Sequence, residues 1–129
     1  MHTAKIAAAI IILVVIITGA GIIANRAFHT TAQKLDDHIA GIENAAAGGN
    51  WVAAEKSLAN MRRDWSQTEK FWSVLLDHSE IDNIESTISK LGKFIQSRNQ
   101  SLALGEAALL RLYIKHIPEK ESFNLKNIL

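Results

Sequence analysis

An uninterrupted apolar segment near the amino terminus constrains this chain more than any other feature. The nineteen residues from Ile6 to Ala24, IAAAIIILVVIITGAGIIA, contain no charged side chain. At about 1.5 Å per residue, a helix of this length covers roughly 28 Å, close to the roughly 30 Å hydrocarbon core of a bilayer. Because a helix satisfies its own backbone hydrogen bonds inside lipid, the segment predicts a transmembrane signal anchor within residues 1–26.

A cleaved secretory signal peptide is the alternative interpretation of the same residues. Its apolar core is usually about 7 to 15 residues long, and here Ile22 and Ile23 lie beyond the best small-residue cleavage site, at Thr18 to Ala20. We therefore expect an uncleaved, single-pass anchor in the cell membrane. The flanking charges are nearly balanced, but the short leader favours a cytoplasmic amino terminus with the rest of the chain outside the cytoplasm.

The remainder of the chain, residues 27–129, is almost neutral, with 12 Lys and Arg against 13 Asp and Glu. It lacks the clustered positive charge on which nucleic-acid binding depends, so we expect no nucleic-acid partner. No cysteine is present, which excludes disulfides, thiol nucleophiles and thiolate metal sites. About a hundred residues suffice for one domain with one core.

Apolar periodicity and the scarcity of breakers predict an all-α fold, with the transmembrane helix followed by an antiparallel four-helix bundle. Gly48 and Gly49 predict the first turn, with Asn50 as the next N-cap. The polar residues after Arg98 predict the last turn, although periodicity alone also allows one continuous helix there. We expect a bundle over residues 27–117, with helices at about 27–47, 50–77, 80–98 and 101–117, and a tail over 118–129 beginning at Pro118.

Each predicted helix carries apolar residues at three- and four-residue spacing, which is typical of a bundle. The first stripe contains Phe28, Thr31, Leu35, Ile39, Ile42 and Ala46. The second contains Trp51, Ala54, Leu58, Met61, Trp65, Thr68, Trp72 and Leu75. The third contains Ile81, Ile84, Ile88, Leu91 and Ile95, and its phase continues through Leu102, Gly105, Leu109 and Leu112. The last helix has the widest apolar face, so we expect it to be the most buried. This face includes Leu102, Leu109, Leu110, Leu112, Tyr113, Ile114 and Ile117.

The chain resembles an uncharacterised family of small, single-anchor helical proteins from spore-forming Gram-positive bacteria, classed as a domain of unknown function. The residues behind this resemblance are Trp65, Trp72, His78, Glu80, Asp82, Leu125, Asn127 and Ile128. It extends over nearly the full length and implies a helical fold and a location in the cell envelope. It implies no activity and no functional residues.

Aromatic side chains are the first candidates for a binding surface, since tryptophan is common at interfaces and in cores. Membrane-interface contact is an alternative for Phe71 and Trp72, which the predicted helix lengths place near the membrane surface. The apolar tail packs back onto the bundle or binds a partner. The candidate partner or membrane-interface residues are Trp51, Trp65, Phe71, Trp72, Phe123 and Ile128.

A polar cluster surrounds the predicted turn between the second and third helices. It contains Asp77, His78, Glu80, Asp82 and Glu85. These side chains suit a divalent cation, but their spacing matches no established metal motif. Acidic residues in a first turn, with Ser79 as the N-cap, already complement the dipole of the third helix. We therefore expect no metal and no cofactor.

Three classes of function follow from these features. We favour a non-enzymatic interaction or adaptor protein of the cell envelope, anchored in the lipid bilayer, that binds a protein partner or itself. An extracytoplasmic ligand-binding sensor module is the alternative, and it would need a separate signalling partner. A hydrolase or metal enzyme ranks last, because only the residues near His78 favour it, and the identity of any small-molecule ligand stays open.

Overall fold

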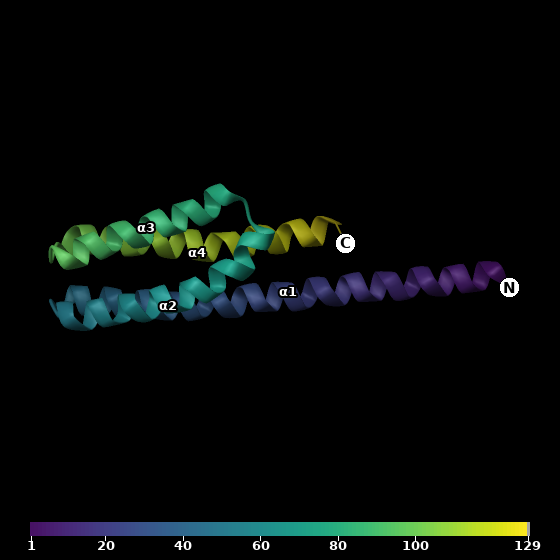
Figure 1. Cartoon of the computed structure of the whole chain (residues 1–129), viewed down its shortest axis with the longest axis horizontal. Coiled ribbons are helices and arrows are strands. Elements are labelled where there is room, and N and C mark those ends of the chain that lie inside the picture. The colour runs from purple at the N-terminus through teal and green to yellow at the C-terminus, as the bar shows by residue number, and fades with distance from the viewer. Residues whose placement is uncertain (129) are drawn as a thin grey trace.

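The chain folds into four antiparallel helices, which confirms the all-α bundle. A computed structural model describes the backbone of residues 1–128 and the side chains of residues 1–117. The helices are α1 (His2–Ala47), α2 (Trp51–Leu75), α3 (His78–Gln96) and α4 (Gln100–Ile128). α1 packs against α2 and α4, and α3 packs against the same two helices (Figure 1). The α2–α3 pair is the least closely packed of these four.

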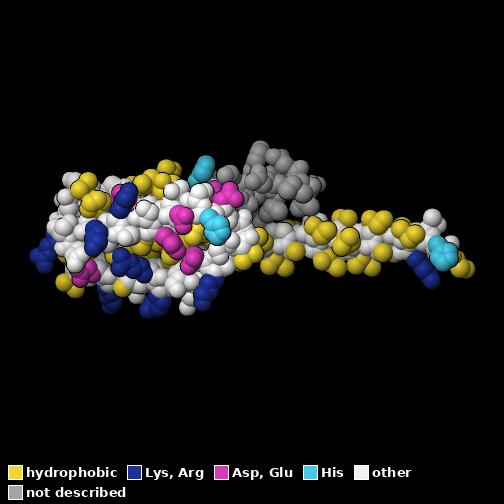
Figure 2. Space-filling model, turned by 45° about the horizontal axis from the view of Figure 1, so that its top comes forward, with side chains coloured by type: hydrophobic (Ala, Val, Ile, Leu, Met, Phe, Trp, Pro, Cys, Tyr) yellow, Lys and Arg dark blue, Asp and Glu magenta, His cyan; other side chains and the backbone are white. Residues whose placement is uncertain are grey.

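The first helix serves two regions of the molecule without a break. Its carboxyl-terminal half belongs to the bundle, whereas its amino-terminal half extends beyond the other helices (Figure 1). The projecting part carries an apolar window that is long enough to cross a membrane, and none of it is buried. Hydrophobic side chains cover this part on the visible face (Figure 2). By length and composition the segment fits a membrane anchor or a signal sequence.

The core confirms the predicted stripes of the first three helices almost residue for residue. α1 adds Ala32, and Thr31 is only half-buried. In α2, Leu75 is exposed and Leu76, just after the helix, is buried in its place. The remaining core residues of these helices are Phe28, Leu35, Ile39, Ile42, Ala46, Ala54, Leu58, Met61, Trp65, Trp72, Ile81, Ile84, Ile88, Leu91 and Ile95.

The turns after α1 and after α3 lie at the end of the bundle opposite the amino terminus, and they use the same backbone motif. After α1, Gly49 has a φ of 72°, and the Asn50 amide donates to the carbonyl of Ala45 at 2.8 Å. After α3, Arg98 has a φ of 55°, and the Asn99 amide donates to the carbonyl of Phe94 at 2.9 Å. A left-handed residue at this position is the usual end of a helix, and glycine is the usual occupant.

Side-chain caps begin the helices that follow these two turns. The Asn50 side chain accepts a hydrogen bond from the amide of Ala53 at 3.1 Å, as predicted. The Asn99 side chain accepts one from the amide of Leu102 at 3.1 Å. α3 begins two residues earlier than the Ser79 cap implied: Asp77 occupies the N-cap without a side-chain hydrogen bond. The predicted cap at Ser79 is therefore wrong.

The end of α4 also differs from the prediction. The helix was expected to stop at Ile117, but it continues through Pro118 to Ile128. A proline removes one backbone hydrogen bond from a helix, yet the residues after it can continue the helical path. The segment predicted as a tail over residues 118–129 is therefore helical as far as residue 128.

Candidate interaction surfaces

Ion pairs fix the rotation of α4 against α1. Nε of Arg111 on α4 donates to Oδ1 of Asp36 on α1 at 2.6 Å, and its Nη1 forms an ion pair with Glu43. Nζ of Lys115 lies 3.5 Å from the second oxygen of Asp36. The hydrogen bond to Asp36 raises the pKa of the Arg111 guanidinium above its ordinary value, so this charge is permanent.

A second contact holds the beginning of α4 to the end of α1. Nε2 of Gln100 donates to the carbonyls of Ala46 and Ala47 at 3.0 and 2.9 Å. The Ala46 carbonyl also accepts from the Gly49 amide at 3.1 Å, so Gln100 adds a second bond there and supplies a partner to Ala47, whose carbonyl lies in the last turn of the helix. Together with Arg111, Gln100 determines which face of α4 is directed into the bundle.

The opposite side of α1 is tied to α2 by a charged cluster. Nε2 of His38 donates to the Asp64 carboxylate at 2.5 Å, and Nζ of Lys34 lies 3.8 Å from the same group. Chiefly because of the hydrogen bond from His38, the pKa of the Asp64 carboxyl is lowered, although burial acts in the opposite direction. The interhelical polar contacts of α2 and α4 described so far therefore all converge on α1.

The inner face of α4 is formed mainly by small and branched side chains. Its buried residues are Ala103, Ala107, Leu110, Ile114 and Ile117. They follow one another at spacings of four and three residues, which is the pattern of a helix face packed in a bundle. The alanines lie in the part of the helix that is closest to Gln100, where a small side chain allows close approach of α1.

The outer face of α4 exposes large apolar side chains. Leu102, Leu109 and Leu112 are 50%, 36% and 62% exposed. Gly105 is also exposed, and a Cβ atom placed on it would meet no neighbouring atom within 4 Å. We call Leu102, Gly105, Leu109 and Leu112 the outer leucine face. These four residues alternate at spacings of three and four, so they form a second continuous stripe on the same helix.

This arrangement corrects the expectation that α4 is the most buried helix. The stripe assigned to the core, which continued the phase of α3, is the outer leucine face. Of the wider apolar face that was predicted, Leu110, Ile114 and Ile117 are buried and Tyr113 is half-buried. The sequence also contains the alternative stripe through Ala103 and Ala107, but its spacing is equally regular, so periodicity does not select it.

The aromatic candidates form an internal cluster. Trp72 is completely buried, and its Nε1 donates to Oγ1 of Thr31 at 3.0 Å. Its ring contacts Phe28, with centroids 5.5 Å apart, and meets Trp65 edge to face at 5.8 Å. Phe71 is half-buried and contacts Phe28 at 5.1 Å. Trp65 and Trp72 are therefore core residues in this structure and present no surface to lipid or to a partner.

The remaining aromatic and tail candidates give no assembled site. Trp51 is half-buried and packs against the core at the beginning of α2. The side chains of Phe123 and Ile128 lie outside the described residues. The structure therefore brings together Trp65, Phe71 and Trp72 of the predicted set, and it does so in the interior.

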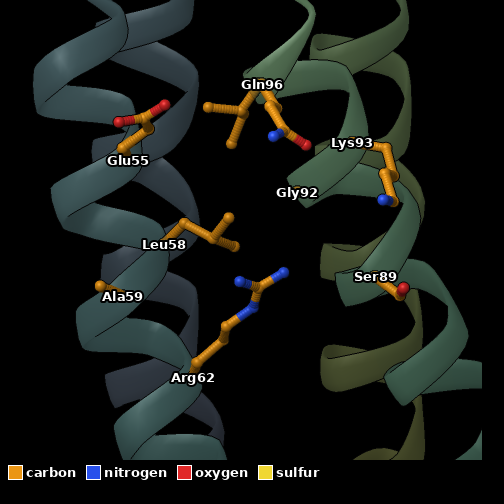
Figure 3. Close-up of a pocket in the computed structure, with 9 residues that line it drawn as sticks. Glu55, Leu58, Ala59, Arg62, Ser89, Gly92, Lys93 and Gln96 are labelled. Carbon is orange, nitrogen blue, oxygen red and sulfur yellow. The ribbon is translucent and has the colours of Figure 1, made fainter.

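A groove of about 440 Å³ separates α2 from α3. Figure 3 shows Arg62 extending from α2 toward Gly92 on α3, beside Leu58 of the same helix. The guanidinium lies directly against Gly92, so a Cβ on residue 92 would displace the end of this flexible side chain. Among the described residues Arg62 has no hydrogen bond or ion pair, in contrast to Arg111. The groove therefore offers Arg62 and Lys93 beside the apolar side chain of Leu58, and the Glu55 carboxylate lines it as well.

The polar cluster at the α2–α3 turn does not form a cation site. Asp77, His78, Asp82 and Glu85 are exposed, and Glu80 is half-buried. No group of three His, Cys, Asp or Glu side chains within residues 1–117 is arranged to hold a metal ion.

Comparison with known proteins adds one finding. The family model "Domain of unknown function (DUF4363)" matches residues 22–128, which include the whole bundle and only the end of the apolar segment. No curated protein and no solved structure matches the chain.

Proposed function

This chain belongs to the DUF4363 family, and we propose that it is a non-enzymatic interaction protein of the cell envelope. In this proposal the apolar half of α1 anchors it in the cytoplasmic membrane, and the bundle lies outside the cytoplasm. Its outer leucine face binds an apolar helix face of another membrane-anchored chain that runs along the same axis.

The anchor is supported by the exposure of the apolar half of α1. None of this window is buried against the bundle, so in water its aliphatic side chains would all be hydrated. Burial in lipid is favourable by about 25 cal/mol per Å² of apolar surface. Because α4 runs antiparallel to α1, an α1 that crosses the bilayer directs the outer leucine face sideways, toward neighbouring proteins, rather than toward the lipid surface.

The single observation that carries the proposal is the exposure of three leucines in helical register on α4. Isolated exposed leucines are ordinary on protein surfaces, but a contiguous stripe of them marks an interaction site. A partner helix with apolar residues at the same spacing would bury this stripe through side-chain interdigitation.

Photocrosslinking of the full-length protein in intact cells tests the proposal. A photoreactive amino acid at Leu112 is expected to give a discrete adduct that disappears when Leu109→Glu places a charge in the same face. The matched control carries the photoreactive residue at Val74, which is 81% exposed on α2. If Leu112 gives no more adduct than Val74, the outer leucine face is not a binding surface.

The groove between α2 and α3 favours a second candidate function, a ligand-binding sensor module. The observation that favours this function is the position of Arg62, which lies beside Leu58 and Gly92 and forms no ion pair among the described residues. Such a site suits a small carboxylate with an apolar portion. Succinate and butyrate are expected to raise the unfolding midpoint of the detergent-solubilised full-length protein, and Arg62→Ala should abolish the rise. A midpoint unchanged by both compounds would reject this function for these ligands.

A further inference from the structure

We infer that the outer leucine face binds a second copy of this chain, in parallel and in register. This inference rests on the proposed function and names the partner at the same surface. It follows from three properties of the described residues: the spacing of the face, the charges beside it, and the area that it offers.

The spacing of the outer leucine face is complementary to itself when two copies lie parallel. Leu102, Gly105, Leu109 and Leu112 alternate like the a and d positions of a heptad. A common amino-terminal anchor gives every copy the same orientation, so the same residue of two copies lies at the same height above the membrane. Each leucine then meets its equivalent across a two-fold axis along the membrane normal.

The charged and titratable groups lie beside the face or at its end. None of the four residues of the face is charged. Lys115 is paired with Asp36 of its own chain, Glu106 is half-buried with one carboxylate oxygen out of contact with solvent, and His116 continues the stripe one turn beyond Leu112. Two copies therefore bring together an apolar stripe that ends at His116, and Gly105 allows the helices to approach closely.

The area of the face explains why the membrane is needed. Three partly exposed leucines bury far less than the roughly 1,200 Å² that stable complexes in solution require. Confinement to one membrane in one orientation raises the effective concentration of the second copy without any new contact. The pair should therefore form in membranes and be largely lost when the protein is dispersed in excess detergent.

Disulfide crosslinking tests the inference, because the chain has no cysteine of its own. Single variants Leu109→Cys and Leu112→Cys of the full-length protein are oxidised in native membranes, with Val74→Cys as the matched exposed control. We expect disulfide-linked dimers at 109 and 112, where Cα atoms would come within the 4.4 to 6.8 Å range of disulfides. Adding Leu109→Glu to Leu112→Cys should lower the dimer fraction at least about tenfold, since like charges would face each other.

Register is tested by mixing copies that carry Leu102→Cys with copies that carry Leu112→Cys. Ten helical residues separate the two heights by about 15 Å, so a parallel pair gives no mixed disulfide. Mixed disulfides, or yields at 109 and 112 no higher than at Val74, would overturn the inference. If those yields are low while the photoreactive residue at Leu112 captures a different chain, the proposed function stands and self-association fails. If Leu112 captures nothing, both fail.

Discussion

The inner and outer faces of α4 are both apolar, but only one of them is buried. The inner face combines Ala103 and Ala107 with the larger Leu110, Ile114 and Ile117, whereas the outer face exposes three leucines. Alanines near the beginning of α4 leave room for α1, and the larger side chains fill the core farther along the helix. The comparison teaches that the rotation of a helix with two apolar stripes is set by what fits against its neighbours and by specific polar contacts.

The polar contacts of α4 explain the outcome. Arg111 reaches Asp36 and Glu43, and Gln100 reaches the final carbonyls of α1. A rotation of α4 that buried Leu102 and Leu109 would carry Arg111 away from its acids and leave charged groups without partners. Small residues on the inner face keep the helices close enough for these contacts to form.

The largest expected effect comes from truncating a leucine on the inner face of α4, and truncating one on the outer face is its matched control. Leu110 is completely buried, so Leu110→Ala should destabilise the bundle by about 3 kcal/mol through lost burial and a residual cavity. Leu112→Ala should change the free energy of unfolding by less than about 0.5 kcal/mol. Urea unfolding of the full-length protein in detergent, followed by tryptophan fluorescence, measures both. Equal losses would show that the two faces are not distinct.

Breaking the ion pairs that orient α4 should have the next largest effect. Arg111→Ala leaves Asp36 and Glu43 without this cation and should cost about 1 to 2 kcal/mol. Lys115→Ala is the matched control, because that side chain is more exposed and should cost less than about 0.5 kcal/mol. The same urea titration compares them, and a loss for Arg111→Ala no greater than for Lys115→Ala would contradict the assignment.

Acid should weaken the contact that joins α1 to α2 through Asp64. Because the pKa of Asp64 is lower in the folded than in the unfolded chain, its stabilisation is fully present above the unfolded pKa, near pH 4, and is lost as the pH falls further. The stability advantage of the wild type over Asp64→Asn should therefore shrink between about pH 5 and pH 2. Urea midpoints at each pH measure it, and a constant difference would show that the pKa is not lowered.

The turn that begins α4 should give the smallest effect. Arg98 adopts the left-handed conformation that glycine tolerates better. Arg98→Gly should stabilise the bundle by up to about 1 kcal/mol. The gain is reduced because glycine also gives the unfolded chain more conformational entropy. Gly49→Ala at the equivalent turn should destabilise it by about 1 kcal/mol. Thermal midpoints measure both, and a gain from Arg98→Gly should leave the disulfide yield at Leu112→Cys unchanged.

Local patterns were sufficient to predict α1, α2 and α3 from the sequence. Their apolar stripes are each unambiguous, and caps such as Asn50 act within three residues of the turn. α4 carries two stripes of equal regularity, so periodicity could not distinguish them. The deciding contact joins Arg111 to Asp36, 75 residues away in the chain. Nothing in a local window contains that information, and the outer leucine face was consequently assigned to the core.

The interpretation of the aromatic residues shows a related limit. Trp65 and Trp72 occupy positions that suit either a core or an interface, and composition alone does not separate the two. The structure places them in the interior, where Trp72 has Thr31 as its hydrogen-bond acceptor. Nε1 of Trp65 is buried without a partner among the described residues. Residue type alone therefore identified the surface neither for tryptophan nor for leucine.

The unbroken course of α1 has a mechanical consequence. No flexible joint separates the apolar segment from the residues that hold α2 and α4, since one helix runs from His2 to Ala47. Transmembrane helices tilt by about 20° on average, and the stretch from Ala24 to Ala47 is a rigid arm of about 35 Å. With the apolar segment in a bilayer, as proposed, such a tilt would swing the far end of the arm by roughly 12 Å, and the thickness of the bilayer would then set the direction of the whole bundle.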